Sequence, residues 1–194
     1  EVLAAVGLLD SDISKIRNVL AAYDRTNAMT LIALSTLLLR LDDEPLTRHA
    51  ASSHSEAPRE RPSTIPLPAL LSMTDLAPAT AELVLTLNRL GTGRGDPILA
   101  SMYRHLAHWP AYLALAWAMI APLDTGSLEQ AIADAVAKAR ERAARVATQL
   151  YVPAEWVSPA ARATIRSAVE PFTGDVIAKM VVICAVLRAT AGPA

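Results

Sequence analysis

Apolar side chains recur at three- and four-residue spacing through almost every segment of this chain except one proline-rich stretch. Alanine and leucine dominate the composition, and β-branched and aromatic residues are sparse, which favours helices over strands. Because 53% of the 194 residues are hydrophobic, the chain can bury a sizeable core. The sequence therefore predicts an all-α protein.

Residues 42–73 interrupt the helical pattern. Prolines lie there among Ser, Glu, Arg and His side chains: Pro45, Pro58, Pro62, Pro66 and Pro68. Repeated prolines remove backbone donors and prevent long helices. We expect a surface linker at 42–73, between a first helical region at 1–41 and a second at 74–194.

The first region is predicted to fold as a helical hairpin. Helical spacing indicates helices over 10–23 and 29–41, and the polar residues 24–27 suggest a turn between them. The second of these helices is apolar nearly all round and should be covered. A missing N-terminal segment, a second copy of the chain or packing onto the second region would cover it. We expect the first of these, because the chain begins at Glu1 without an initiator Met.

The second region is predicted to hold six helices. The first begins at a cap on Thr74 or Asp75 and ends near Leu90, and the others lie over 98–108, 111–121, 127–150, 158–172 and 175–189. Ser127 and Ser158 are the expected N-caps of two of them. The last two helices match the hairpin of the first region, since Ile16-Arg17 corresponds to Ile165-Arg166. This match predicts two related helical repeats in a pseudo-twofold arrangement, the first lacking its front half.

The segment 101–117 holds half of the Phe, Trp and Tyr residues of the chain. Pro110 should end the preceding helix at or before Trp109 and produce a Trp-Pro corner. The spacing of the aromatic residues fits two alternatives. Trp109, Tyr112 and Trp117 are either core residues or the wall of a small-ligand site.

Polar residues near the corner are candidates for chemistry. His105 and His108 share a helix face, and either could serve as a base near neutral pH or stabilise the corner. Ser101 has no evident base partner in the sequence. Asp96 is either a poor base at a helix N-terminus or the cap before Pro97.

The pattern Tyr103-x-x-Leu106-Ala107-x-Trp109-Pro110-x-Tyr112-Leu113-x-x-Ala116-Trp117, with the predicted hairpin, resembles the group I 2-haloacid dehalogenases. The resemblance implies two all-α repeats joined by a long linker. It also implies displacement of halide from a short 2-haloacid by water that an aspartate activates. In that family the aspartate follows a serine and precedes the tyrosine. Here Ser101 matches the serine, but Met102 occupies the aspartate position and Ala116 that of a family asparagine.

Two functions follow as alternatives. The protein is either a hydrolase acting on a small carboxylic acid such as a 2-haloacid, or a relative without that reaction that binds a small apolar or carboxylate ligand or a protein partner. Met102 and Ala116 favour the second, because neither can supply the family chemistry. The candidate ligand-binding residues are Asp96, Ser101, Tyr103, His105, His108 and Trp109.

Composition argues against nucleic-acid binding and against insertion into a membrane. A formal net charge of −1 gives no reason to expect nucleic acid as a partner. No apolar run reaches the roughly 20 residues of a bilayer span, and no signal peptide opens the chain. Cys184, the single cysteine, lies in an apolar run and is expected to be a buried thiol. We therefore expect a cytoplasmic protein, and we predict neither a metal site nor a cofactor.

Overall fold

The computed structural model describes residues 2–41, 66–90, 98–150 and 157–192. In chain order the elements are α1 (Val2–Ala5), α2 (Asp10–Leu41), the 3₁₀ helix η1 (Met73–Asp75), α3 (Pro78–Arg89), α4 (Ser101–Leu106), α5 (Pro110–Ile120), α6 (Thr125–Ala147), α7 (Pro159–Pro171), the π-helical turn η3 (Phe172–Val176) and α8 (Ile177–Ala191). These ranges contain no strand, so the all-α prediction is confirmed. None of their helices is both long and apolar enough to cross a membrane.

The first region is one helix and not a hairpin. α2 runs for 32 residues without interruption, so the predicted turn at 24–27 is wrong. None of those four residues is Gly or Pro, and the turn was inferred only from their polarity. Asp24 instead forms an ion pair with Arg188 of α8, so tertiary contacts give a polar residue a place inside the helix.

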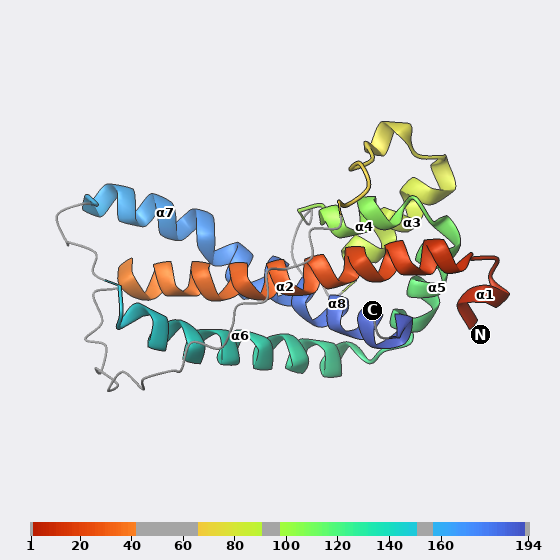
Figure 1. The fold of residues 1–194 in the computed structure, drawn as a ribbon. Helices are drawn as coiled ribbons and strands as arrows, with labels where there is room; N and C mark the ends of the chain where they lie inside the picture. Colours follow the sequence, from red (N-terminus) through yellow and green to blue (C-terminus); the bar gives the residue numbers. More distant parts are fainter. Residues whose placement is uncertain (1, 42–65, 91–97, 151–156, 193–194) are drawn as a thin grey trace.

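α2 is the axis of the molecule. α6 runs beside it in the same direction, and α8 runs beside it in the opposite direction (Figure 1). The helices α3, α4 and α5 gather around the N-terminal half of α2, and both ends of the described chain lie at this end (Figure 1). The long helix is therefore the surface on which most other helices pack.

Polar contacts fix α2 against α8. Arg17 Nε donates to the Ala191 carbonyl at 2.7 Å, and the buried Cys184 thiol donates to the Leu20 carbonyl at 3.3 Å. Burial raises the pKa of the Cys184 thiol to about 12, which confirms the expected buried thiol. Gly192 ends α8 at φ 80°, and a Cβ there would lie 2.9 Å from Arg17 Nη2.

Two apolar cores lie along α2. The first surrounds its N-terminal half and includes Ile16, Leu20, Leu87, Tyr112 and Leu187. The second lies where α2 meets α6 and α8 and includes Leu31, Leu128, Ile132, Ala139 and Ala178. Packing onto the second region thus covers Leu31, whereas Met29 and Leu37 on another side of α2 stay exposed.

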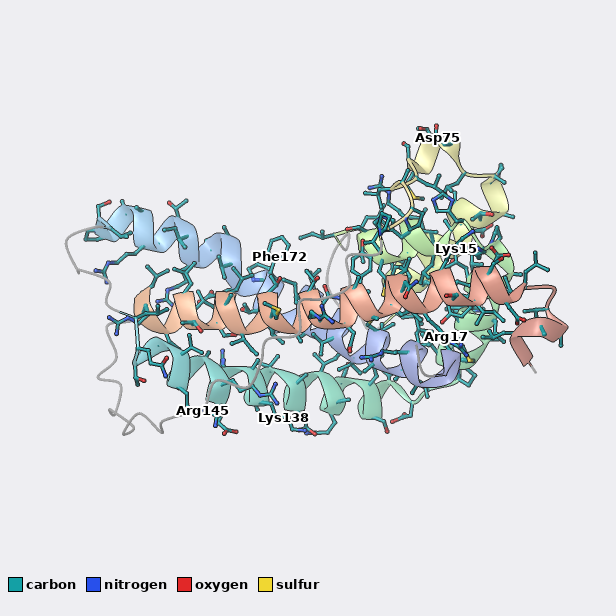
Figure 2. The ribbon with its side chains drawn as sticks, in the orientation of Figure 1. Lys15, Arg17, Asp75, Lys138, Arg145 and Phe172 are labelled. Atoms are coloured by element: carbon teal, nitrogen blue, oxygen red, sulfur yellow. The ribbon has the colours of Figure 1, made fainter. Side chains whose placement is uncertain are left out.

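The second predicted hairpin is also one continuous helical path. α7 passes through the π-helical turn η3 into α8 without reversing direction, and the path bends near Phe172 (Figure 2). Pro171 immediately precedes this turn, a usual cause of a helix bend. Without a turn at either place, the described residues show no pair of related hairpins and no pseudo-twofold arrangement.

Helix starts depend on the strongest acceptor available. Ser158 caps α7 as predicted, with its Oγ accepting from the Ala161 N–H at 3.2 Å. The predicted cap of α6 at Ser127 is wrong, because Asp124 caps that helix and its Oδ2 accepts from the Ser127 N–H at 2.8 Å. A carboxylate accepts more strongly than a hydroxyl and also suits the positive end of the helix dipole.

Buried polar side chains shape the approach to α4. Asn88 Oδ1 accepts from the Ala100 N–H at 3.0 Å, and Asn88 Nδ2 donates to the Ile98 carbonyl at 3.2 Å. Lys179 of α8 donates to the Asn88 carbonyl at 3.0 Å, and burial lowers the pKa of its ammonium group. These bonds hold 98–100 outside the helix, so α4 is shorter than predicted.

We expect Thr26→Pro to reduce the free energy of unfolding by about 3 kcal/mol or more, because proline inside a helix removes a hydrogen bond and clashes with the preceding turn. Thr26→Ala at the same exposed position should change it by less than about 0.5 kcal/mol. Chemical denaturation followed by circular dichroism measures both. If the proline variant were as stable as the alanine variant, the continuous helix would be contradicted and a turn at 24–27 would be supported.

Candidate ligand-binding site at the Trp-Pro corner

The Trp-Pro corner forms as predicted. Trp109 precedes α5, Pro110 is the first residue of that helix, and the Trp109 N–H donates to the Leu106 carbonyl at 2.9 Å. The Trp109 carbonyl accepts from Tyr112 and Leu113 N–H groups at 2.9 and 3.1 Å. Proline suits this place because its fixed φ starts a helix and its missing N–H has no partner to lose.

Residues 66–71, which are neither helix nor strand, contact Arg104 of α4 and His108 after it, and are called the strap below. Arg104 Nε donates to the Leu71 carbonyl at 2.6 Å, and His108 Nε2 lies 2.8 Å from the Ala69 carbonyl. The backbone of Pro68 also acts on His105 and raises the pKa of its ring, against the larger lowering by burial. The prolines of the strap lack N–H donors, so its carbonyls are the groups that attach it to α4.

His105 is hydrogen-bonded to a tyrosine of α2. Its Nδ1 is 2.7 Å from the Tyr23 hydroxyl. Ser101 acts on Tyr23 and lowers the pKa of the phenol, and the backbone of Pro68 acts on His105 and raises the pKa of the ring, each against the larger and opposite effect of burial. Ser101, Tyr23 and His105 thus lie together beneath the strap.

These side chains contain no activated nucleophile. His105 Nδ1 is already hydrogen-bonded to the Tyr23 hydroxyl and so does not accept a proton from Ser101. Ser101 adjoins Tyr23, whose pKa is raised mainly by burial, and a phenol is not a base at neutral pH. Ser101 and His105 were both candidates from the sequence, whereas Tyr23, which lies on a different helix, was not.

Two residues that the sequence analysis singled out are core residues. Met102 is 1% exposed and Tyr103 is fully buried, both within the first core. The Tyr103 hydroxyl has no hydrogen-bond partner in the described part of the chain, and burial raises its pKa. A third predicted residue, Asp96, lies outside the described residues.

A cavity of about 510 Å³ opens between the strap, the corner and α2, and is called the strap groove below. Its lining residues are Lys15, Asn18, Pro66, Leu67, Pro68, His108 and Trp109. Of the predicted site residues it brings together His108 and Trp109, whose rings pack at 5.8 Å between centroids. Ser101, Tyr103 and His105 are not part of this lining.

The other five lining residues were missed by sequence reasoning, and of these Lys15 and Asn18 carry the polar side chains. Lys15 and Asn18 lie one helical turn apart on α2, and Lys15 stands on the side of α2 toward α4 and the strap (Figure 2). Lys15 is 62% exposed and lies 3.9 Å from Asp12, a contact that leaves most of its charge facing solvent. In the sequence this pair looks like any solvated helix face, so no local signal marks it.

Comparison of the chain with models of protein families, with curated proteins and with solved structures finds no match. The assignment to the group I 2-haloacid dehalogenases therefore has no support outside the sequence pattern itself.

We expect the His105 ring to titrate below pH 6.5, the ordinary value, because burial disfavours its charged form. The pKa of His105 is higher in the unfolded chain, so its contribution to stability is complete above about pH 6.5 and is lost as the pH falls below that value. Proton NMR of the imidazole signals, assigned with His105→Gln, measures the pKa. A value at or above 6.5 would contradict the buried neutral ring.

Proposed function

We propose that this protein binds a small carboxylic acid in the strap groove. The observation that carries the proposal is the meeting of Lys15, Asn18 and His108 with the indole of Trp109 around one cavity of about 510 Å³. Small-molecule sites are typically apolar cavities of about 300–1,000 Å³ with a few polar groups that orient the ligand. The strap groove has this composition.

The polar side of the groove suits an anion. The Lys15 ammonium supplies a positive charge, and the side-chain amide of Asn18, which makes no hydrogen bond in the described part of the chain, supplies N–H donors. Charge-assisted hydrogen bonds are about twice as strong as neutral ones, so a carboxylate gains more here than an amide or alcohol.

The other side of the groove suits a short apolar body. Pro66, Leu67 and Pro68 form one wall, and the tilted rings of His108 and Trp109 form another. His108 is held by the Ala69 carbonyl, so its ring has a fixed orientation against the indole. A ligand with a carboxylate at one end and a few carbons at the other fits both sides.

The lining favours binding over halide displacement. Direct attack of water on a 2-haloacid needs a proton acceptor, and no Asp or Glu lies among the described lining residues. The lining histidine, His108, has its Nε2 on the Ala69 carbonyl, and no described lining carboxylate supports it as a base. Met102 cannot serve, because a thioether takes up no proton at neutral pH and the side chain is buried in the core. Of the two alternatives from the sequence, the ligand-binding one therefore has more support.

Binding is tested by titrating propionate and the uncharged propionamide, with isothermal titration calorimetry as the readout. We expect propionate to bind with one-to-one stoichiometry and propionamide to bind at least tenfold more weakly. Lys15→Gln should weaken propionate binding about tenfold, the usual effect of losing a charged hydrogen-bond partner. Arg25→Gln, an exposed charge change elsewhere on α2, should leave it unchanged. Equal effects of the two variants, or no saturable binding, would overturn the proposal.

Catalysis is tested separately with 2-chloropropionate and a chloride assay. We expect binding without catalytic chloride release, because general-base assistance contributes about 10²–10⁴-fold and the described lining contains no carboxylate to supply it. Multiple turnovers of chloride release by the unmodified protein would restore the hydrolase alternative.

A further inference from the structure

A second groove, far along α2 from the strap, lies between α2 and α6 and is called the α2–α6 groove below. It encloses about 320 Å³. Its lining residues are Ala28, Leu31, Ile32, Ala131, Asp134, Ala135, Lys138, Ala139, Arg142 and Val181. We propose that this groove binds a carboxylate that carries one unbranched alkyl chain.

The inner surface of the groove is apolar. Leu31 and Ala139 are only 2% and 4% exposed and belong to the second core, against which Ile32 and Val181 also pack. The remaining apolar lining residues are alanines, and their short side chains leave space between two helices that otherwise lie side by side (Figure 1). An alkyl chain laid here would cover apolar surface without displacing any bonded polar group.

The shape of the groove favours a single chain. Its α6 lining extends from Ala131 to Arg142, a span of about 16 Å at 1.5 Å rise per residue. A volume of about 320 Å³ is at the lower end of small-molecule sites. A long and narrow space of this kind suits one extended chain better than a compact ring system.

The rim of the groove carries the headgroup partners. Lys138 and Arg142 lie one turn apart on α6, and within the described chain neither has a hydrogen bond or ion pair (Lys138 is labelled in Figure 2). Among the described lining residues the one carboxylate is Asp134, which accepts a hydrogen bond from Gln130 Nε2 at 2.9 Å. Two unpaired cations against one carboxylate leave the rim with a net positive charge, which complements an anionic headgroup.

The test uses decanoate below its micelle-forming concentration, with decyltrimethylammonium as a ligand of the same chain and opposite charge. Isothermal titration calorimetry at two temperatures gives affinity and heat capacity. We expect one decanoate per chain, a negative heat-capacity change from burial of the alkyl chain, and binding at least tenfold weaker for the cationic ligand. Equal affinity of the two ligands would overturn the proposal.

Variants place the ligand within the groove. Lys138→Gln combined with Arg142→Gln should weaken decanoate binding tenfold or more. Circular dichroism of each variant serves as the control that its helices are kept. Ala135→Phe should abolish decanoate binding by filling the groove. Arg140→Gln, the same charge change on the exposed side of α6, and Lys15→Gln in the strap groove should both leave it within twofold. Wild-type affinity in the double variant would refute the assignment, whatever the strap groove binds.

Discussion

The antiparallel contact between α2 and α8 is the interaction on which the other features depend. Apolar burial supplies most of its stability, and the bonds from Arg17 to the Ala191 carbonyl and from Cys184 to the Leu20 carbonyl fix its register. With that register set, Tyr23 reaches His105 on α4 and Leu31 reaches the core beneath α6. Both grooves therefore lie along one helix whose position α8 determines.

The fold class could be predicted because helical spacing is a local property of the sequence. The Trp-Pro corner was also predictable, since Pro110 restricts its own residue and the one before it. The prediction of a turn at 24–27 was wrong because polarity alone does not end a helix. Asp24 remains within α2 and forms an ion pair with Arg188, which is distant in sequence. The cap of α6 depends on neighbouring residues only, but both Asp124 and Ser127 have side-chain oxygens that could accept from the first N–H groups. The structure shows that Asp124 is the cap.

The candidate site was less predictable because it is assembled from three separate parts of the chain. His108 and Trp109 come from the corner, Pro66 and Pro68 from the strap, and Lys15 from α2. Each part has an ordinary local pattern, and only their convergence makes a cavity. The buried Lys179 shows the same limit, because its carbonyl partner on Asn88 is 91 residues away in sequence.

The π-helical turn between α7 and α8 has a consequence for the alignment of helix faces. A π-helical turn places one more residue in a turn than an α-helix does, so residues before and after it occupy shifted angular positions. Removing a single residue, such as Gly174, would convert the path to regular α-helix and rotate the faces of α7 by about 100° relative to α8. The extra residue thus sets which side of α7 and which side of α8 face α2, the helix that both of them contact.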